Sequence, residues 1–276
     1  KVAMPAPAQT SVEGRIGGTP LAGRHAVVTG ASRGIGAAIA ATLARLGADV
    51  ALVGRDRARL DAVGAEIAAG TGRSTLALVA DVADDAAVRH AFEQAQAMLG
   101  TPSILVNNAG VARSAPFHRA DDSHWREAID VNLMGAVHCA RAALPAMTKA
   151  GHGRIVNVAS TAGLKGYAYV AAYCAAKHAL VGLTRALALE TATTGVTVNA
   201  VCPGYTETDI LSTAVDNIVA KTGRSVEETR AELAATNPMR RFVDPVEVAE
   251  AVAWLCLPSS AAITGQAVAV AGGEVM

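Results

Sequence analysis

Short apolar runs alternate along this chain with longer segments in which apolar positions recur at helical spacing. The short runs are rich in Val, Ile and Leu and are nearly continuous, which is typical of strands buried on both faces of a sheet. They predict strands at residues 25–29, 49–53, 75–79, 103–107, 154–158, 197–201 and 267–270. Helical patterns lie between them, for example at residues 36–46, 84–99, 122–150, 172–190 and 245–256.

This alternation predicts right-handed βαβ units, and hence an α/β fold with a doubly wound parallel sheet of about seven strands and helices on both faces. No internal repeat or Pro-rich linker interrupts residues 23–276, so we expect them to form a single domain. Residues 1–22 lack the continuous apolar segment of a signal peptide, and we expect a flexible N-terminal tail there.

One connection is much longer than the others. About forty residues separate the strand at 197–201 from the helix at 245–256, whereas most strand–helix connections in such folds are short. This connection contains a predicted pair of helices at 208–221 and 225–235. Ligands of open α/β sheets bind beyond the carboxyl ends of the strands, so residues 205–243 are a candidate lid. A purely structural helical excursion is the alternative.

Composition excludes several classes of protein. The 276 residues are 51% hydrophobic, yet no apolar run reaches the 18 residues that a membrane span needs. The chain carries 24 basic and 24 acidic residues, which argues against a nucleic-acid-binding module. Four widely spaced cysteines argue against a disulfide framework and favour a reducing, cytoplasmic location. The seven histidines show no ligand spacing, so we expect no metal.

A glycine-rich turn follows the first predicted strand and opens a helix, with the spacing G-x-x-x-G-x-G from Gly30 to Gly36. Gly30 provides the positive φ that turns the chain out of the strand. Gly34 lets the backbone approach a pyrophosphate, and Gly36 lets the helix pack closely on the sheet. The helix N-terminus then offers free N–H groups and a positive dipole end to phosphates. This context predicts a dinucleotide site.

The end of the second predicted strand bears on which dinucleotide binds. Folds that prefer NAD place an acid there to bind the ribose 2′-hydroxyl, but this strand ends in Gly54 followed by Arg55. Arg55 and Arg33 together can hold a 2′-phosphate, so the charges favour NADP(H). NAD(H) stays possible, because Asp56 turned inward would reverse the preference, and Arg55 paired with Asp56 would be an ordinary surface residue. Asp81, just past the third strand, is placed to reach adenine.

A candidate acid–base pair lies in the helical pattern at 172–190. Tyr173 and Lys177 are four residues apart and so share one helix face, and Ser160 follows the fifth predicted strand. Alone, this spacing is also that of an amphipathic helix with a surface lysine. A phenol is too weak an acid at neutral pH, and we expect the Lys177 ammonium to lower the pKa of Tyr173.

Further motifs stand around these residues in a fixed order. They are Thr29-Gly30 with Gly34 and Gly36, Asp81-Val82, Asn107-Asn108-Ala109-Gly110, Asn132, Pro203-Gly204, Thr264-Gly265-Gln266 and Gly272-Gly273. Together with Ser160, Tyr173 and Lys177, this set resembles the short-chain dehydrogenase/reductase family over nearly the whole chain from Thr29 onward. The sequence is especially similar to 3-oxoacyl-thioester and polyketide ketoreductases in that family. One departure is Ala271, where the family usually has an acid.

The resemblance implies a Rossmann-type fold, a homotetramer or homodimer, and an oxidoreductase that moves a hydride between nicotinamide and a carbonyl compound or secondary alcohol. It implies the catalytic residues Asn132, Ser160, Tyr173 and Lys177, in which Ser160 binds the substrate oxygen and Asn132 fixes a helix kink. It also implies that Lys177 binds the nicotinamide ribose, and that Thr206 and Thr208 bind the carboxamide. The expected cofactor contacts are Gly30, Ser32, Arg33, Gly34, Ile35, Gly36, Arg55, Asp81, Val82, Asn108, Ala109, Gly110, Tyr173, Lys177, Pro203, Gly204, Thr206 and Thr208.

The substrate is less constrained than the reaction. Basic and aromatic residues near the predicted site suggest a bulky, partly anionic substrate; they are Lys165, Tyr167, Tyr169, Lys221, Arg224, Arg240 and Arg241. NADPH-dependent reduction of a 3-oxoacyl thioester of CoA or acyl carrier protein is our leading hypothesis. A general secondary-alcohol, steroid or sugar dehydrogenase is the alternative, and a catalytically silent dinucleotide-binding regulator is a remote one. For the basic residues, ordinary salt bridges are the alternative, above all for Arg241.

Overall fold

The computed structural model describes residues 18–275, so most of the predicted tail lies outside the described residues. A sheet of seven strands forms the centre of the molecule, and every neighbouring pair is parallel. The strands are β1 (His25–Thr29), β2 (Asp49–Gly54), β3 (Thr75–Val79), β4 (Ile104–Asn107), β5 (Gly153–Val158), β6 (Val196–Pro203) and β7 (Ala267–Val270). Their order, β3-β2-β1-β4-β5-β6-β7, confirms the predicted doubly wound sheet.

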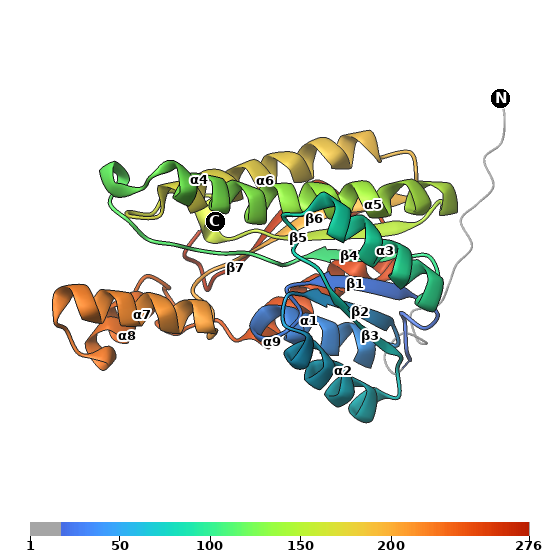
Figure 1. Cartoon of the computed structure of the whole chain (residues 1–276), viewed down its shortest axis with the longest axis horizontal. Coiled ribbons are helices and arrows are strands. Elements are labelled where there is room, and N and C mark those ends of the chain that lie inside the picture. Colours follow the sequence, from blue (N-terminus) through green and yellow to red (C-terminus); the bar gives the residue numbers. More distant parts are fainter. Residues whose placement is uncertain (1–17, 276) are drawn as a thin grey trace.

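Helices cover both faces of this sheet (Figure 1). One layer consists of α1 (Gly34–Arg45), α2 (Arg57–Thr71) and α9 (Pro245–Cys256). The other consists of α3 (Asp85–Leu99), α4 (Asp122–Ile129), α5 (Gly135–Ala150) and α6 (Ala171–Glu190). Three apolar clusters result: one between the sheet and α1 and α9, one between the sheet and α3 and α5, and a smaller one between the sheet and α6. Because β1, β4, β5 and β6 are buried along their whole length, the continuous apolar runs predicted these strands well.

The segment predicted as one helix at 122–150 contains an irregular turn. α4 and α5 are joined by a π-helical turn, Asp130–Met134, in which Asn132 is buried. The Asn132 side chain donates a hydrogen bond of 2.9 Å from Nδ2 to the Ala128 carbonyl oxygen, one turn earlier in the helix. A side chain that takes up a helical carbonyl in this way competes with the backbone ladder, which accounts for the local widening of the helix.

α2 is absent from the predicted helices. Its buried positions are Leu60, Gly64 and Ile67, which have helical spacing, but the central one carries no side chain. Gly64 packs closely on the sheet, since a Cβ there would lie 3.1 Å from the Thr75 hydroxyl on β3. Asp56 caps the helix by accepting a hydrogen bond from the Arg59 backbone N–H. The close packing of α2 on the sheet therefore conceals its apolar face in the sequence.

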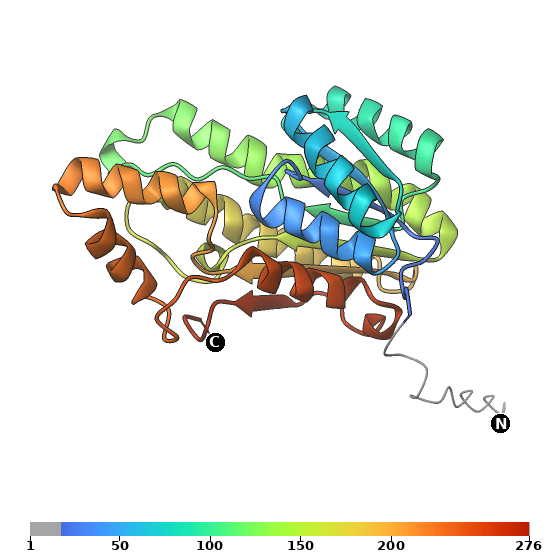
Figure 2. The same ribbon diagram turned by 90° about the horizontal axis from the view of Figure 1, so that it is seen from below.

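The long connection forms two helices, as predicted, and we call residues 205–243 the insertion. They are α7 (Asp209–Thr222) and α8 (Val226–Ala234), with Gly223 in the left-handed conformation between them. Figures 1 and 2 show both helices projecting beyond one end of the sheet. Only Leu211 and Val215 of α7 and Thr229 of α8 are buried, so the insertion packs loosely compared with the other helices.

Candidate active site

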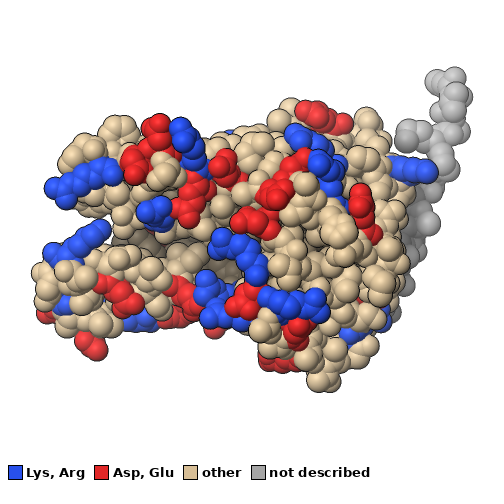
Figure 3. Space-filling model, in the orientation of Figure 1, with Lys and Arg blue, Asp and Glu red and all other residues tan. Residues whose placement is uncertain are grey.

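A cavity of about 1020 Å³ opens at the carboxyl ends of the strands. In the space-filling view it is a hollow between the part that carries α4 and the part that carries α7 and α8, with basic side chains on both sides (Figure 3). Every residue that the sequence predicted as a catalytic residue or a cofactor contact lines this cavity. The sheet therefore brings together side chains and backbone from Gly30 to Thr208.

The glycine-rich turn is as tight as its sequence predicted. Gly30 and Gly34 have φ values of +64° and +54°. A Cβ on Gly36 would overlap the Gly30 carbonyl oxygen and would lie 2.5 Å from Nδ2 of Asn108. Asn108 itself donates hydrogen bonds to the Thr29 and Gly30 carbonyl oxygens at 2.9 and 3.2 Å. These contacts leave no room for a side chain at Gly36.

The N-terminus of α1 is open for an anion. Arg33 occupies the N-cap position, but its side chain makes no capping hydrogen bond, and the first turn contains no acidic residue. Gly34, Ile35 and Gly36 line the cavity at this point. Free N–H groups at a helix N-terminus bind phosphate, so this cradle fits a pyrophosphate.

A basic cluster, made of Arg33, Arg55 and Arg59, lines the cavity beyond the ends of β1 and β2. Arg33 pairs with Asp209 of α7 at 2.6 Å, and Arg55 lies 3.7 Å from Asp81. Arg55 is thus not paired with Asp56, which caps α2 and lies 3.3 Å from Arg59 Nε. Arg59 also lines the cavity and was missed from the sequence, although it stands four positions after Arg55 at the start of a helix.

Ser160, Tyr173 and Lys177 form the opposite wall. Lys177 is 3% exposed, and its Nζ donates a hydrogen bond of 2.9 Å to the Val158 carbonyl oxygen at the end of β5. This Nζ lies 5.7 Å from the centroid of the Tyr173 ring. Ser160 Oγ accepts the Ala162 N–H at 3.1 Å, which leaves its own hydroxyl proton for another acceptor.

The protonation of this wall differs in one respect from the prediction. Burial raises the pKa of Tyr173 to about 12, although a hydrogen bond with Ser160 acts in the opposite direction. Burial also lowers the pKa of Lys177 to about 8. The pKa of Tyr173 is therefore raised, not lowered as expected, because burial disfavours the charged phenolate and is the largest cause of the shift.

Asn132 connects the π-helical turn to the loop after β4. Its Oδ1 accepts the Val111 N–H at 3.2 Å, and its Nδ2 donates to the Val111 carbonyl oxygen at 2.9 Å. Gly110 lets this contact form close to Lys177, since a Cβ there would lie 2.9 Å from Asn132 Oδ1 and 3.6 Å from Lys177 Nζ. The loop that carries the N-N-A-G motif is thus attached to the helix behind the catalytic wall.

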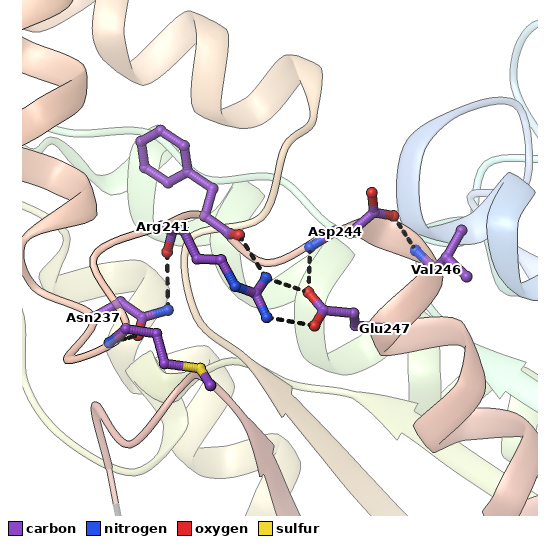
Figure 4. A network of polar contacts seen from close by, with 7 residues as sticks. Asn237, Arg241, Asp244, Val246 and Glu247 are labelled. Atoms are coloured by element: carbon purple, nitrogen blue, oxygen red, sulfur yellow. Dashed lines mark hydrogen bonds and ion pairs between the residues drawn. The ribbon is translucent and has the colours of Figure 1, made fainter.

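None of the basic residues expected to receive an anionic substrate lines the cavity. Arg224 pairs with Glu232, and Arg241 forms two 2.6 Å contacts with Glu247 at the start of α9 (Figure 4). Lys165, Tyr169, Lys221 and Arg240 also lie outside the lining. Of the whole set, only Tyr167 lines the cavity, so the salt-bridge alternative holds for Arg224 and Arg241.

Apart from Thr206 and Thr208, the side chains of the insertion that reach the cavity were not predicted from the sequence. Tyr205, Asp209, Ile210, Leu211, Thr213, Ala214 and Asn217 line it. The helical period of α7 gave some signal for the last five, because they lie on one broad face of that helix. Within residues 18–275 no three His, Cys, Asp or Glu side chains group as metal ligands would. None of the helices described is long and apolar enough to cross a membrane.

Comparison with known proteins agrees with this geometry. The family model described as short chain dehydrogenase matches residues 24–219. The chain belongs to the short-chain dehydrogenase family. This membership makes it an oxidoreductase that interconverts an alcohol and a carbonyl compound with a nicotinamide dinucleotide, in agreement with the resemblance inferred from its motifs.

Three relatives of this short-chain dehydrogenase are similar over nearly their whole length. It is 41% identical to the putative ketoacyl reductase 1 of the granaticin polyketide synthase of Streptomyces violaceoruber, over 90% of this chain and 92% of that one. It is 40% identical to D-beta-hydroxybutyrate dehydrogenase of Cupriavidus necator, over 92% and 99%. A crystal structure of an actinorhodin polyketide ketoreductase variant with NADPH has a TM-score of 0.88 and 37% identity, over 93% and 98%.

Proposed function

We propose that this short-chain dehydrogenase reduces a 3-oxoacyl thioester with NADPH, or carries out the reverse oxidation. The observation that carries the proposal is the single cavity that joins the open N-terminus of α1 to the wall of Ser160, Tyr173 and Lys177. The similarity to a putative ketoacyl reductase and to a polyketide ketoreductase supports the choice of a ketoacyl substrate.

In this proposal the wall supplies the proton and the electrostatic stabilisation. A nicotinamide dinucleotide held in this cavity would supply or accept the hydride at the substrate carbon. The Tyr173 phenol, with a pKa raised to about 12, holds its proton at neutral pH and gives it to the oxygen that becomes an alkoxide. Ser160, which already accepts the Ala162 N–H, donates its hydroxyl proton in a hydrogen bond to the same oxygen. Lys177 is mostly protonated at pH 7 and stabilises the phenolate left behind.

Asn132 is proposed as a positioning residue, because it holds the loop at Val111 next to Lys177. Thr206 and Thr208 are proposed to bind the carboxamide of the nicotinamide. Both line the cavity, and the Thr208 hydroxyl donates to the Thr206 carbonyl oxygen at 3.2 Å.

NADP(H) is the proposed cofactor, and NAD(H) is the alternative. The residues fit a 2′-phosphate, because Arg33, Arg55 and Arg59 line the cavity where β2 ends in Gly54 rather than in an acid. Asp56 is occupied as the cap of α2, which argues against its turning inward toward a ribose hydroxyl. The related ketoreductase structure contains NADPH.

The test is a set of absorbance assays at the nicotinamide band, with NADPH and NADH in parallel. Acetoacetyl-CoA, free ketones, a steroid ketone and a keto sugar serve as substrates. We expect saturable turnover of acetoacetyl-CoA that is lost in Tyr173→Phe, which lacks the phenolic proton. Activity with free ketones and none with any acyl thioester would reject the thioester proposal and favour a general secondary-alcohol, steroid or sugar dehydrogenase. That second function is supported by the similarity to a hydroxybutyrate dehydrogenase.

Assembly and location stay predictions. The expected homotetramer or homodimer would use the outer faces of α5 and α6, and Leu189 at the end of α6 is 81% exposed. A cytoplasmic location is consistent with four cysteines that are all buried and free of disulfides. Size-exclusion chromatography with light scattering tests the assembly directly.

A further inference from the structure

A buried carboxylate lies beside the cavity, at a position that the motifs of this family do not include. It belongs to Glu274, whose side chain is 1% exposed. Gly272 and Gly273, with φ values of +57° and +89°, turn the chain back after β7, and the Glu274 N–H donates to the Ala271 carbonyl oxygen at 3.1 Å. This turn directs Glu274 into the protein rather than into solvent.

The two oxygens of this carboxylate differ in their surroundings. Oε1 accepts a hydrogen bond of 2.5 Å from the Tyr167 hydroxyl and lies 3.2 Å from Lys165 Nζ. Oε2 is buried and has no hydrogen-bond partner among residues 18–275. It lies against Gly204, where a Cβ would be only 3.0 Å away. Gly204 therefore makes room for the carboxylate next to the turn that follows β6.

Tyr167 is held by several contacts besides Glu274. Its phenolic oxygen lies 2.7 Å from Thr161 Oγ1, and its ring packs edge-on against Tyr205, with centroids 6.5 Å apart. Lys165 Nζ stands 5.0 Å from the ring centroid. Tyr167 and Tyr205 both line the cavity. Tyr167 also belongs to the segment between Ser160 and Tyr173, so its position determines the wall that a substrate meets beside both groups.

Burying a carboxylate with one unsatisfied oxygen is unfavourable, and an apolar side chain at this position would avoid that cost. We propose that Glu274 is a positioning residue, which acts through Tyr167 to fix the substrate-facing wall between Ser160 and Tyr173 and so sets the size of substrate that the site prefers. The proposal rests on the proposed reductase activity in one respect: the experiment that tests it measures that reaction.

The test compares wild type with Glu274→Gln, Glu274→Ala, Tyr167→Phe and the double variant Glu274→Gln/Tyr167→Phe. Reduction of 2-butanone and 2-octanone with NADPH reports on substrate size, because these ketones differ only in chain length. We expect Glu274→Ala to raise the KM for 2-butanone about tenfold, as for loss of a charge-assisted hydrogen bond, with kcat and the KM for NADPH within about twofold of wild type. Without its hydrogen bond to Glu274, Tyr167 should be able to move aside for a longer chain. The ratio of kcat/KM values should then shift toward 2-octanone.

Two results and one control distinguish a positioning role of Glu274 from a general effect on the stability of the protein. Glu274→Gln, which keeps an oxygen acceptor for Tyr167, should show a smaller change than Glu274→Ala. The effects of Glu274→Gln and Tyr167→Phe should not multiply in the double variant, because Glu274→Gln weakens the same hydrogen bond that Tyr167→Phe removes. Glu250→Gln removes an exposed partner of Arg45 on α9 and serves as the matched control.

Unchanged KM and unchanged chain-length preference in Glu274→Ala would overturn the inference. So would an equal loss of kcat with both ketones, since that would indicate a merely structural role. If wild type reduces neither ketones nor thioesters, the proposed function itself fails, and this outcome is distinct because it concerns the unmodified protein.

Discussion

The nucleotide-binding region and the insertion both line the same cavity, yet they are built very differently. α1 buries six of its twelve residues, and its first turn is pressed against the Gly30 carbonyl oxygen. α8 buries one of its nine residues, and α7 only two of fourteen. The part of the site formed by α1, the strand ends and the wall of Ser160, Tyr173 and Lys177 therefore belongs to the core, and we call it the core wall. The insertion, in contrast, is joined to the rest of the protein by a few polar contacts at its base.

Those contacts lie where the insertion joins α9. Arg241 points at Glu247, whose carboxylate also accepts the Asp244 N–H at 2.8 Å, and Asn237 donates to the Arg241 carbonyl oxygen at 2.9 Å (Figure 4). Loosely packed segments open at low free-energy cost. The lid role of the insertion stays a prediction, and its loose packing is what such a role requires.

The largest expected effect lies in the core wall, at Lys177. In Lys177→Met we expect kcat/KM to fall by about 10²–10⁴-fold, because the variant loses the ammonium that stabilises the phenolate. With a pKa lowered to about 8, Lys177 loses its proton above that pH, so the wild-type rate should also fall there. Initial rates from pH 6 to 10 measure both effects, with Lys149→Met as the surface control. A loss of less than tenfold would contradict this role.

The second effect concerns the packing of the nucleotide turn. Gly36→Ala places a Cβ about where the Gly30 carbonyl oxygen lies, so the turn must shift. We expect NADPH to bind about 10–100-fold more weakly, measured by fluorescence titration. Gly70→Ala is the matched control, because Gly70 lies in α2 and a Cβ added there would meet no other atom within 4 Å. Equal affinity in the two variants would show that the turn tolerates displacement.

A smaller effect is expected at the basic cluster. Arg55→Ala should raise the KM for NADPH about tenfold and leave the KM for NADH within about twofold, because only NADPH carries the 2′-phosphate. Arg89→Ala removes an exposed arginine that pairs with Asp85 far from the cavity, and it should change neither value. A parallel rise for both cofactors would assign Arg55 to the fold rather than to cofactor choice.

The smallest effect is expected at the base of the insertion. Its hydrogen bonds with Arg241 lower the pKa of Glu247 to about 2, so the charged carboxylate stabilises the folded state above its ordinary pKa of 4.5. Both side chains are more than a third exposed, so Glu247→Gln should lower the Tm at pH 7 by roughly 2 °C or less. This difference should shrink as the pH falls from 4.5 toward 2. A difference that is constant with pH would exclude the ion pair as its cause, and Glu66→Gln is the exposed control.

The core wall was also the part that the sequence predicted best. Buried parallel strands are continuous apolar runs, so their ends could be located within one or two residues, and Ser160 and Asn108 were placed at those ends. Tyr173 and Lys177 followed from helical spacing. These features depend on local pattern, which a single sequence contains.

The unpredicted features depend on contacts between distant segments. α2 packs through Gly64, so its apolar face has a gap. The helix kink at Asn132 was expected only from the family resemblance, and its form as a π-helical turn was not predicted. Arg59 and Glu274 gain their environment only when the chain folds, and the burial of Tyr173 reversed the expected direction of its pKa shift. None of these is encoded in the spacing of residue types.

The contacts between Thr29 and the loop after β4 bear on how the protein folds. The Thr29 hydroxyl accepts the N–H groups of Asn108 and Ala109 at 3.0 Å, across about 80 positions of sequence. Contacts between such distant segments form late, since the entropy of closing the intervening loop must first be overcome. Because Asn108 and Ala109 follow Thr29 by about 80 residues, the phosphate turn leaves the ribosome well before the loop that completes it. Recovery of cofactor binding on refolding should accordingly lag behind the recovery of helical structure.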